Sequence, residues 1–192
     1  MKNCIKKAII TWLFKEDLED EAYDIYSYGI YQIVSYVINF FTILLIGIAF
    51  RTLLEVIILV VFFMAVRPYA GGYHASSAIK CYILTNIMII GALLAIKYIQ
   101  INNIFMICLL ALNSIVIFVL APVDTANKRL DEIEYIVYRK KTVKILSVEI
   151  IISIIMIAMN CHIVAECIIF AHIILSFALI AGIASNLGIK NE

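Results

Sequence analysis

The residues that could do chemistry in this sequence lie together between positions 67 and 81. Cys81 follows His74 by seven residues, and the cations Arg67 and Lys80 lie nearby. A cysteine attacks a carbonyl only as the thiolate, and free cysteine has a pKa of about 8.5. A histidine that accepts the thiol proton makes the thiolate available. The segment therefore indicates a thiol active site, with Cys81 as nucleophile and His74 as general base and then general acid.

The spacing of this pair does not suit a single uninterrupted helix. On an uninterrupted helix, residues seven apart share a face but lie about 10.5 Å apart along the axis. A hydrogen bond needs about 3 Å. Pro68 and the pair Gly71-Gly72 therefore predict a bent or re-entrant segment at 67–81, with Pro68 preventing simple continuation of the preceding helix. From spacing alone, a structural loop followed by a buried cysteine is the alternative.

The composition predicts an integral membrane protein. Hydrophobic residues make up 65% of the 192 residues and charged residues 15%, whereas a soluble domain has about 45–50% and 25%. A soluble fold of this size has too little interior to bury so much apolar surface. No basic stripe with interleaved aromatic residues is present, so we expect no nucleic-acid partner. We expect one membrane-embedded domain over residues 1–192.

Six apolar stretches define the expected all-α architecture, since a helix needs about 20 residues to cross the hydrocarbon core. The segment 1–24 predicts an amphipathic helix with lysines and Trp12, which would lie on the membrane surface or pack on the protein's own loops. A polar segment, 122–144, separates the fourth and fifth stretches. The six-span bundle is expected within 25–186, with spans at 25–50, 52–66, 82–96, 104–121, 145–160 and 163–186.

The positions of the basic residues predict the orientation in the membrane. Six spans place thirteen of the fifteen lysines and arginines on one side and only Arg51 and Lys97 on the other. Lysine and arginine concentrate in cytoplasmic loops. Both termini and the segment 67–81 are therefore expected to be cytoplasmic.

Two stretches of the sequence resemble those of a known family. The pattern Arg67-Pro-x-Ala-Gly-Gly-Tyr-His74, with Cys81 seven residues further on, resembles the signature of the AgrB family. These are bacterial membrane cysteine endopeptidases of peptide quorum-sensing systems. The stretch Ala121-Pro-Val-Asp-Thr-x-Asn-Lys128 resembles the family's second recognisable segment. Chain length, six spans and the charged amino-terminal helix also fit, so the resemblance covers essentially the whole chain.

The resemblance implies a reaction and a substrate. An AgrD-type propeptide would carry an amphipathic leader, a signal core and an acidic carboxyl-terminal tail. Cys81 would attack where the tail joins the core and hold the core as a thioester. A cysteine or serine of the core would then close a thiolactone or lactone ring. The resemblance further implies the plasma membrane of a bacterium. We expect lipid around the spans, and no cofactor. A homodimer is left open.

Residues around the predicted pair have several interpretations. Arg67 would bind substrate carboxylates or order the loop, although an arginine at a helix end also snorkels to the interface. Gly71 and Gly72 would shape the loop, let a substrate chain approach closely, or present amide groups to an oxyanion. Asp124 or Asn127 would orient His74 as a third member. For Asp124 the alternative is the N-cap of a helix.

A basic cluster follows the second family-like stretch. It could attract the acidic propeptide tail, but we favour a role in membrane orientation and binding to anionic lipid. Its members are Lys128, Arg129, Arg139, Lys140, Lys141 and Lys144.

Polar residues in the apolar stretches have ordinary explanations. Glu149 lies near a span end and is expected to reach the interface. Glu166 and His172 are expected to form hydrogen bonds between helices. The run from Cys161 to Cys167 faintly resembles a metal site, but it lacks the spacing of zinc ligands, so we expect no metal.

One rival function stays open at this point. In a non-catalytic membrane transporter or peptide exporter, His74 and the basic loops would only bind the peptide. Short, interrupted spans suit a broken transport helix as well as a re-entrant active site. A family member that cleaves without cyclising is a third alternative.

Overall fold

The computed structural model describes residues 20–73, 77–124 and 129–189. Within these ranges the regular structure is helical, and five helices, all except α6, are long and apolar enough to cross a membrane. The all-α, multi-pass membrane architecture is thereby confirmed, while a sixth span and an interfacial helix at 1–24 stay predictions. The helices are α2 (Asp20–Phe50), α3 (Leu53–Ala70), α4 (Ala78–Tyr98), α5 (Asn103–Leu120), α6 (Glu132–Ala158) and α7 (His162–Ile189).

The chain divides into two compact units, Met1–Thr42 and Ile43–Glu192. In the first unit the structure describes part of α2, whose apolar side chains, such as Ile33 and Phe41, are exposed. Exposed apolar side chains suit a helix surrounded by lipid. The candidate site lies entirely in the second unit.

The helix α6 differs from the predicted fifth span. It begins at Glu132 rather than near residue 145, because Asp131 caps it: the Asp131 carboxylate accepts a hydrogen bond from the Glu134 amide at 2.6 Å. Glutamate, lysine and arginine are good helix formers, so most of the predicted polar segment is helical. The apolar half of α6 still contains Glu149.

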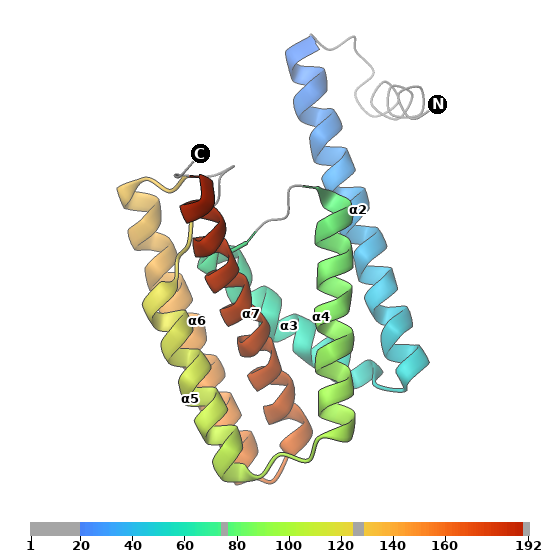
Figure 1. Cartoon of the computed structure of the whole chain (residues 1–192), viewed down its shortest axis with the longest axis vertical. Coiled ribbons are helices and arrows are strands. Elements are labelled where there is room, and N and C mark those ends of the chain that lie inside the picture. The colour runs from blue at the N-terminus through green and yellow to red at the C-terminus, as the bar shows by residue number, and fades with distance from the viewer. Residues whose placement is uncertain (1–19, 74–76, 125–128, 190–192) are drawn as a thin grey trace. The chain divides into compact units, whose positions relative to one another are not determined.

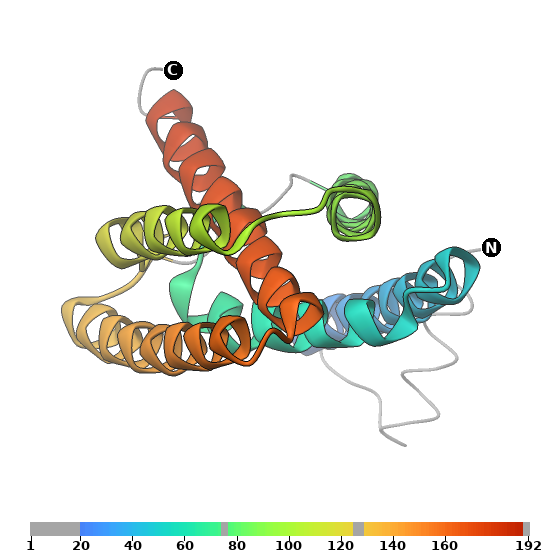
Figure 2. The ribbon, with the colours of Figure 1, turned by 90° about the horizontal axis from the view of Figure 1, so that it is seen from below.

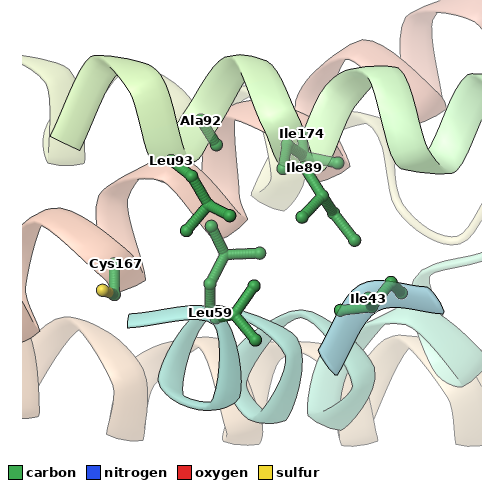
Figure 3. Packing of buried hydrophobic residues seen from close by; sticks show 8 residues of the cluster. Ile43, Leu59, Ile89, Ala92, Leu93, Cys167 and Ile174 are labelled. Atoms are coloured by element: carbon green, nitrogen blue, oxygen red, sulfur yellow. The ribbon is translucent and has the colours of Figure 1, made fainter. Parts of the chain in front are cut away.

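The helix α7 is the centre of the second unit. Half of the residues in its span (50%) are buried, against 22–28% in α3, α4 and α5. Figure 2 shows α7 crossing the unit diagonally, with α5 on one side and α4 on the other, and it also contacts α3 and α6. Figure 3 shows Leu59 of α3, Leu93 of α4 and Ile174 of α7 in one buried cluster. Because lipid is as apolar as these side chains, close packing rather than water exclusion stabilises such contacts.

The helices from α4 to α7 alternate in direction (Figure 1). The amino-terminal end of α4 therefore lies at the same end of the unit as the connection between α5 and α6. The basic residues 139–144 of α6 and Lys80 of α4 lie toward this end. Lys97 lies at the opposite end, where its ammonium donates to the Phe50 carbonyl at 2.8 Å. The sidedness of the charges thus recurs in the structure, while the cytoplasmic assignment stays a prediction.

Candidate functional site

The helix α3 ends at its glycines and not at its proline. We expected Pro68 to prevent continuation, and this was wrong, because α3 continues to Ala70. Pro68 lies in the last turn, where a missing backbone donor affects few remaining hydrogen bonds. Gly71 and Gly72 follow with φ angles of 70° and 112°, a region that glycine adopts without strain. The predicted interruption of the helix within 67–81 is therefore present, since α3 ends at Ala70 and α4 begins only at Ala78.

The glycine pair binds to the second family-like stretch through the backbone. The Val123 amide donates to the Ala70 carbonyl at 2.9 Å, and the Gly72 amide donates to the Val123 carbonyl at 3.4 Å. A Cβ atom on Gly71 would lie 2.1 Å from the Val123 oxygen. Gly71 is thus required for this close approach, and segments about fifty residues apart form one bridge.

The amide groups of the glycine pair are already used within the protein. Gly71 donates to the Arg67 carbonyl at 3.2 Å, and Gly72 donates to Val123. These hydrogen bonds agree with the loop-shaping interpretation of the glycine pair, while the oxyanion role stays a prediction. Both donors are taken because α3 and the 121–124 segment approach closely.

Arg67 reaches over the loop that follows α3. Its guanidinium donates to the Gly71 carbonyl and, at 2.7 Å, to the Tyr73 carbonyl. The planar guanidinium can hold two acceptors at once, which a lysine cannot do with the same geometry. These contacts agree with the loop-ordering interpretation of Arg67.

Cys81 lies exposed in the first turns of α4. Ser77 caps this helix in an extended conformation, and its hydroxyl accepts a hydrogen bond from the Lys80 amide at 3.3 Å. The Cys81 amide donates to the Ser77 carbonyl at 3.1 Å. The amino-terminal end of a helix favours negative charge, so a thiolate here would lie at the favourable end of α4. His74 lies outside the described residues, and its distance from the Cys81 sulfur stays a prediction.

Asp124 lies in the extended segment after α5 and does not cap a helix. The N-cap alternative was wrong, since Asp131 caps α6. The Asp124 carbonyl accepts a hydrogen bond from the Asn186 side chain of α7 at 2.8 Å. Sequence reasoning missed Asn186, although an amide side chain late in an apolar span was a usable signal. Asn127 and Lys128 lie outside the described residues.

A hollow of about 250 Å³ lies beside this segment. It is mainly apolar, with the Asp124 and Asn186 side chains as its polar lining. Its lining residues are Leu120, Pro122, Val123, Asp124, Ile183, Asn186 and Leu187.

Two members of the basic cluster, Arg139 and Lys141, contact residues near the ends of α5 and α3. Arg139 donates to the Ala121 carbonyl, and its guanidinium lies 4.6 Å from the centre of the Phe118 ring. The Lys141 ammonium lies 4.8 Å from the centre of the Tyr69 ring. Such cation–π contacts are worth about 0.5–1 kcal/mol at exposed sites. Both cations thus stabilise these helix ends.

A buried pair joins α6 to α7 away from the loop. The Glu149 carboxylate and the His172 Nε2 atom are 2.8 Å apart, and their side chains are 3% and 1% exposed. The expected hydrogen bond from His172 to another helix is confirmed. The expectation that Glu149 reaches the interface was wrong, because the central position of α7 covers this face of α6. Among the described residues, no group of three potential ligands could hold a metal ion.

Comparisons with known proteins were made for the whole chain. The sequence profile described as AgrB, accessory gene regulator B, matches residues 6–179. A Clostridium perfringens (strain 13) protein named "Putative AgrB-like protein 2" is 28% identical over 117 residues, covering 57% of this chain and 55% of that protein. A "Putative AgrB-like protein" of strain SM101 is 28% identical over 144 residues, covering 71% of this chain and 67% of that protein. The chain thus spans about half the length of the first of these relatives.

No solved structure matches the chain. The family profile covers most of its length, including both stretches that the bridge between Gly71 and Val123 joins. This chain therefore belongs to the accessory gene regulator B (AgrB) family.

Proposed function

We propose that this chain is a membrane cysteine endopeptidase that removes the carboxyl-terminal tail of an AgrD-type propeptide and cyclises the core. The observation that carries the proposal is the position of Cys81. Its side chain is exposed in the first turns of α4, directly after the loop held by Arg67 and Val123. Membership of the AgrB family supports a role in processing a quorum-sensing peptide.

The first half of the reaction breaks the peptide bond between core and tail. His74 takes the proton from the Cys81 thiol, and the sulfur forms a bond to the carbonyl carbon of the last core residue. The C–N bond then breaks, and His74 returns the proton to the departing amine of the tail. The first turn of α4 offers backbone amides to the developing oxyanion, since the first amides of a helix have no intrahelical acceptor.

In the second half, a side chain of the core displaces Cys81 and closes the ring. The thiol or hydroxyl of a core residue attacks the thioester carbonyl, with His74 accepting its proton. The bond to Cys81 breaks, and the sulfur recovers that proton. The net change is one peptide bond replaced by one thioester or ester bond, with the tail leaving as a free amine. Water would instead give a linear product, so a site shielded by the membrane edge favours cyclisation.

The charges around the site suit the proposed substrate. Lys80 precedes Cys81, and the exposed Arg129 follows the 121–124 segment. Both would attract the acidic tail, with Arg67 and the glycine pair keeping the loop in shape. Asp124, Asn127 and Lys128 complete the same segment in the sequence. We propose that this end of the protein faces the cytoplasm of the bacterial cell.

The acyl-enzyme itself provides the test. The test uses an AgrD-type propeptide, sought among the open reading frames beside the gene, with its ring-forming cysteine or serine replaced by alanine. Without an internal nucleophile the second half stops, so we expect the mass of the intact protein to increase by that of the leader and core together, less one water. Hydroxylamine should remove the added mass, because it cleaves thioesters.

Matched variants locate the thioester. Cys108→Ala should still acquire the added mass, since Cys108 is an exposed cysteine on another helix, α5. Cys81→Ala should not acquire it. Cleavage of the tail without any adduct on Cys81 would contradict covalent catalysis, and uncut precursor found outside the cells would favour the exporter. Mass spectrometry of the normal product separates cyclisation from simple cleavage.

A further inference from the structure

Gly182 is a buried glycine within α7 whose presence the helix itself does not explain. A glycine inside a helix costs about 1 kcal/mol relative to alanine. A Cβ atom at Gly182 would lie 2.7 Å from the Tyr73 nitrogen and 2.8 Å from the Gly72 carbonyl carbon. At Gly91, within α4, a Cβ atom would meet nothing within 4 Å. Gly182 is therefore the place where the backbone of the loop lies directly against α7.

The loop backbone is fitted to α7 from its own side as well. The Tyr73 amide donates to the Ala178 carbonyl at 2.7 Å. A Cβ atom on Gly72 would lie 2.9 Å from that same oxygen. In an α-helix residue 182 stacks over the carbonyl of residue 178, so one small region of α7 receives both loop residues.

Arg67 binds the carbonyl group of Tyr73, the residue whose amide group is bound by α7. Its guanidinium donates to the Tyr73 carbonyl at 2.7 Å, while α7 binds the Tyr73 amide. The Tyr73 carbonyl belongs to the planar peptide unit that also contains the nitrogen of His74. The two contacts therefore fix the orientation of the Tyr73 amide and carbonyl, the last described groups before His74.

We infer that Gly182 of α7, together with Arg67 of α3, forms a seat for the backbone of Tyr73, and that His74 can serve Cys81 only when this seat is intact. The inference rests on the proposed function, because it requires His74 to serve Cys81. Gly182 is a positioning residue, since it contacts the loop backbone and not the reacting atoms. Its role is to leave room: any side chain would push the loop away from α7.

The test compares Gly182→Ala with Gly91→Ala and uses His74→Ala as reference. The probe is iodoacetamide, applied to the full-length protein in detergent at pH 6.5 and at pH 9.5. Lys80 and Lys97 bracket Cys81, so trypsin places it in a different peptide from Cys108, and mass spectrometry follows its alkylation separately. The readout is the ratio of the Cys81 alkylation rates at the two pH values.

The expected results follow from which rate depends on His74. At pH 9.5 a free thiol is ionised without help, so this rate should change little. At pH 6.5 a free thiol is only about 1% ionised, and reaction depends on the imidazole as proton acceptor. We expect Gly182→Ala to lower the ratio about tenfold, toward His74→Ala, and Gly91→Ala to keep the wild-type ratio. With the propeptide as substrate, kcat should fall about 100-fold and KM should change little, as for a misplacement of about 1 Å.

A merely structural role would lower the melting temperature of Gly182→Ala without changing the ratio, and that result would overturn the inference. Should Gly182→Ala fail to give monodisperse protein, Arg67→Lys decides, because it removes the second hold on the peptide without adding an atom beside α7. A lowered ratio then supports the seat, and a wild-type ratio rejects it. Should His74→Ala itself keep the wild-type ratio, the proposed catalytic pair fails, and the inference falls with it.

Discussion

Cys81→Ala is expected to reduce propeptide cleavage by about 10⁴-fold or more, as the loss of a covalent nucleophile does in other peptidases. Without the sulfur no thioester forms, so neither cleavage of the tail nor closure of the ring can follow. Cys81→Ser should be nearly as inactive, because a hydroxyl is a far weaker nucleophile than a thiolate at neutral pH. The measurement is the fraction of tagged propeptide that stays uncut when each variant is co-expressed with it.

Cys108→Ala is the matched control for this experiment. Both cysteines are free and exposed in the structure, but Cys108 lies within α5, remote in sequence from either family-like stretch. Its removal should leave cleavage within about twofold of wild type, as expected for an exposed position outside the site. Normal cleavage by Cys81→Ala, at normal protein levels in the membrane, would contradict the proposed mechanism.

Glu149→Ala is expected to produce the largest loss of stability. The substitution leaves the His172 Nε2 atom buried without its acceptor, at a cost of about 1–3 kcal/mol. For a protein of this size about 2 kcal/mol lowers Tm by roughly 4–8 °C. His172→Ala should have a similar effect, because it leaves the Glu149 carboxylate buried without its partner. Thermal unfolding in detergent, followed by circular dichroism, measures both shifts.

Two further variants separate pairing from other effects of the substitution. Glu132→Ala removes the same side chain from an exposed position of the same helix. It should cost only about 0.3–1 kcal/mol, through the lost interaction with the helix dipole. The double variant Glu149→Met, His172→Leu replaces both partners by apolar side chains and should recover most of the lost stability. A single variant that melts like wild type would show that the pair contributes nothing.

The bridge between Gly71 and Val123 holds the two family-like stretches next to each other. The two stretches that carry the family resemblance are separate in the sequence, yet Val123 exchanges backbone hydrogen bonds with Ala70 and Gly72. Arg139 holds the same segment through the Ala121 carbonyl. A change in the position of the 121–124 segment would therefore also shift the backbone of Gly71 and Gly72.

The sequence by itself indicated an all-helical membrane protein and a candidate site at 67–81. Apolar runs of sufficient length can only be membrane helices, and five of the six helices satisfy that condition by length and composition. The break at Gly71-Gly72 was also predictable, because two adjacent glycines remove the steric barrier to left-handed backbone angles. The spacing of His74 and Cys81 independently predicted that no continuous helix holds both, and α4 begins only at Ala78.

Only the tertiary structure decided which surfaces meet at that break. Nothing in the spacing of Gly182 or Asn186 indicated that α7 lies against the Tyr73 amide and the Asp124 carbonyl. Nor did the sequence show that Glu149 turns inward to His172 instead of reaching the interface. Apolar periodicity is nearly uniform around these helices, so it indicates that a helix is embedded but not which face packs against which neighbour. That choice depends on close contacts between backbones distant in the sequence, where a single missing Cβ atom decides whether two segments can touch.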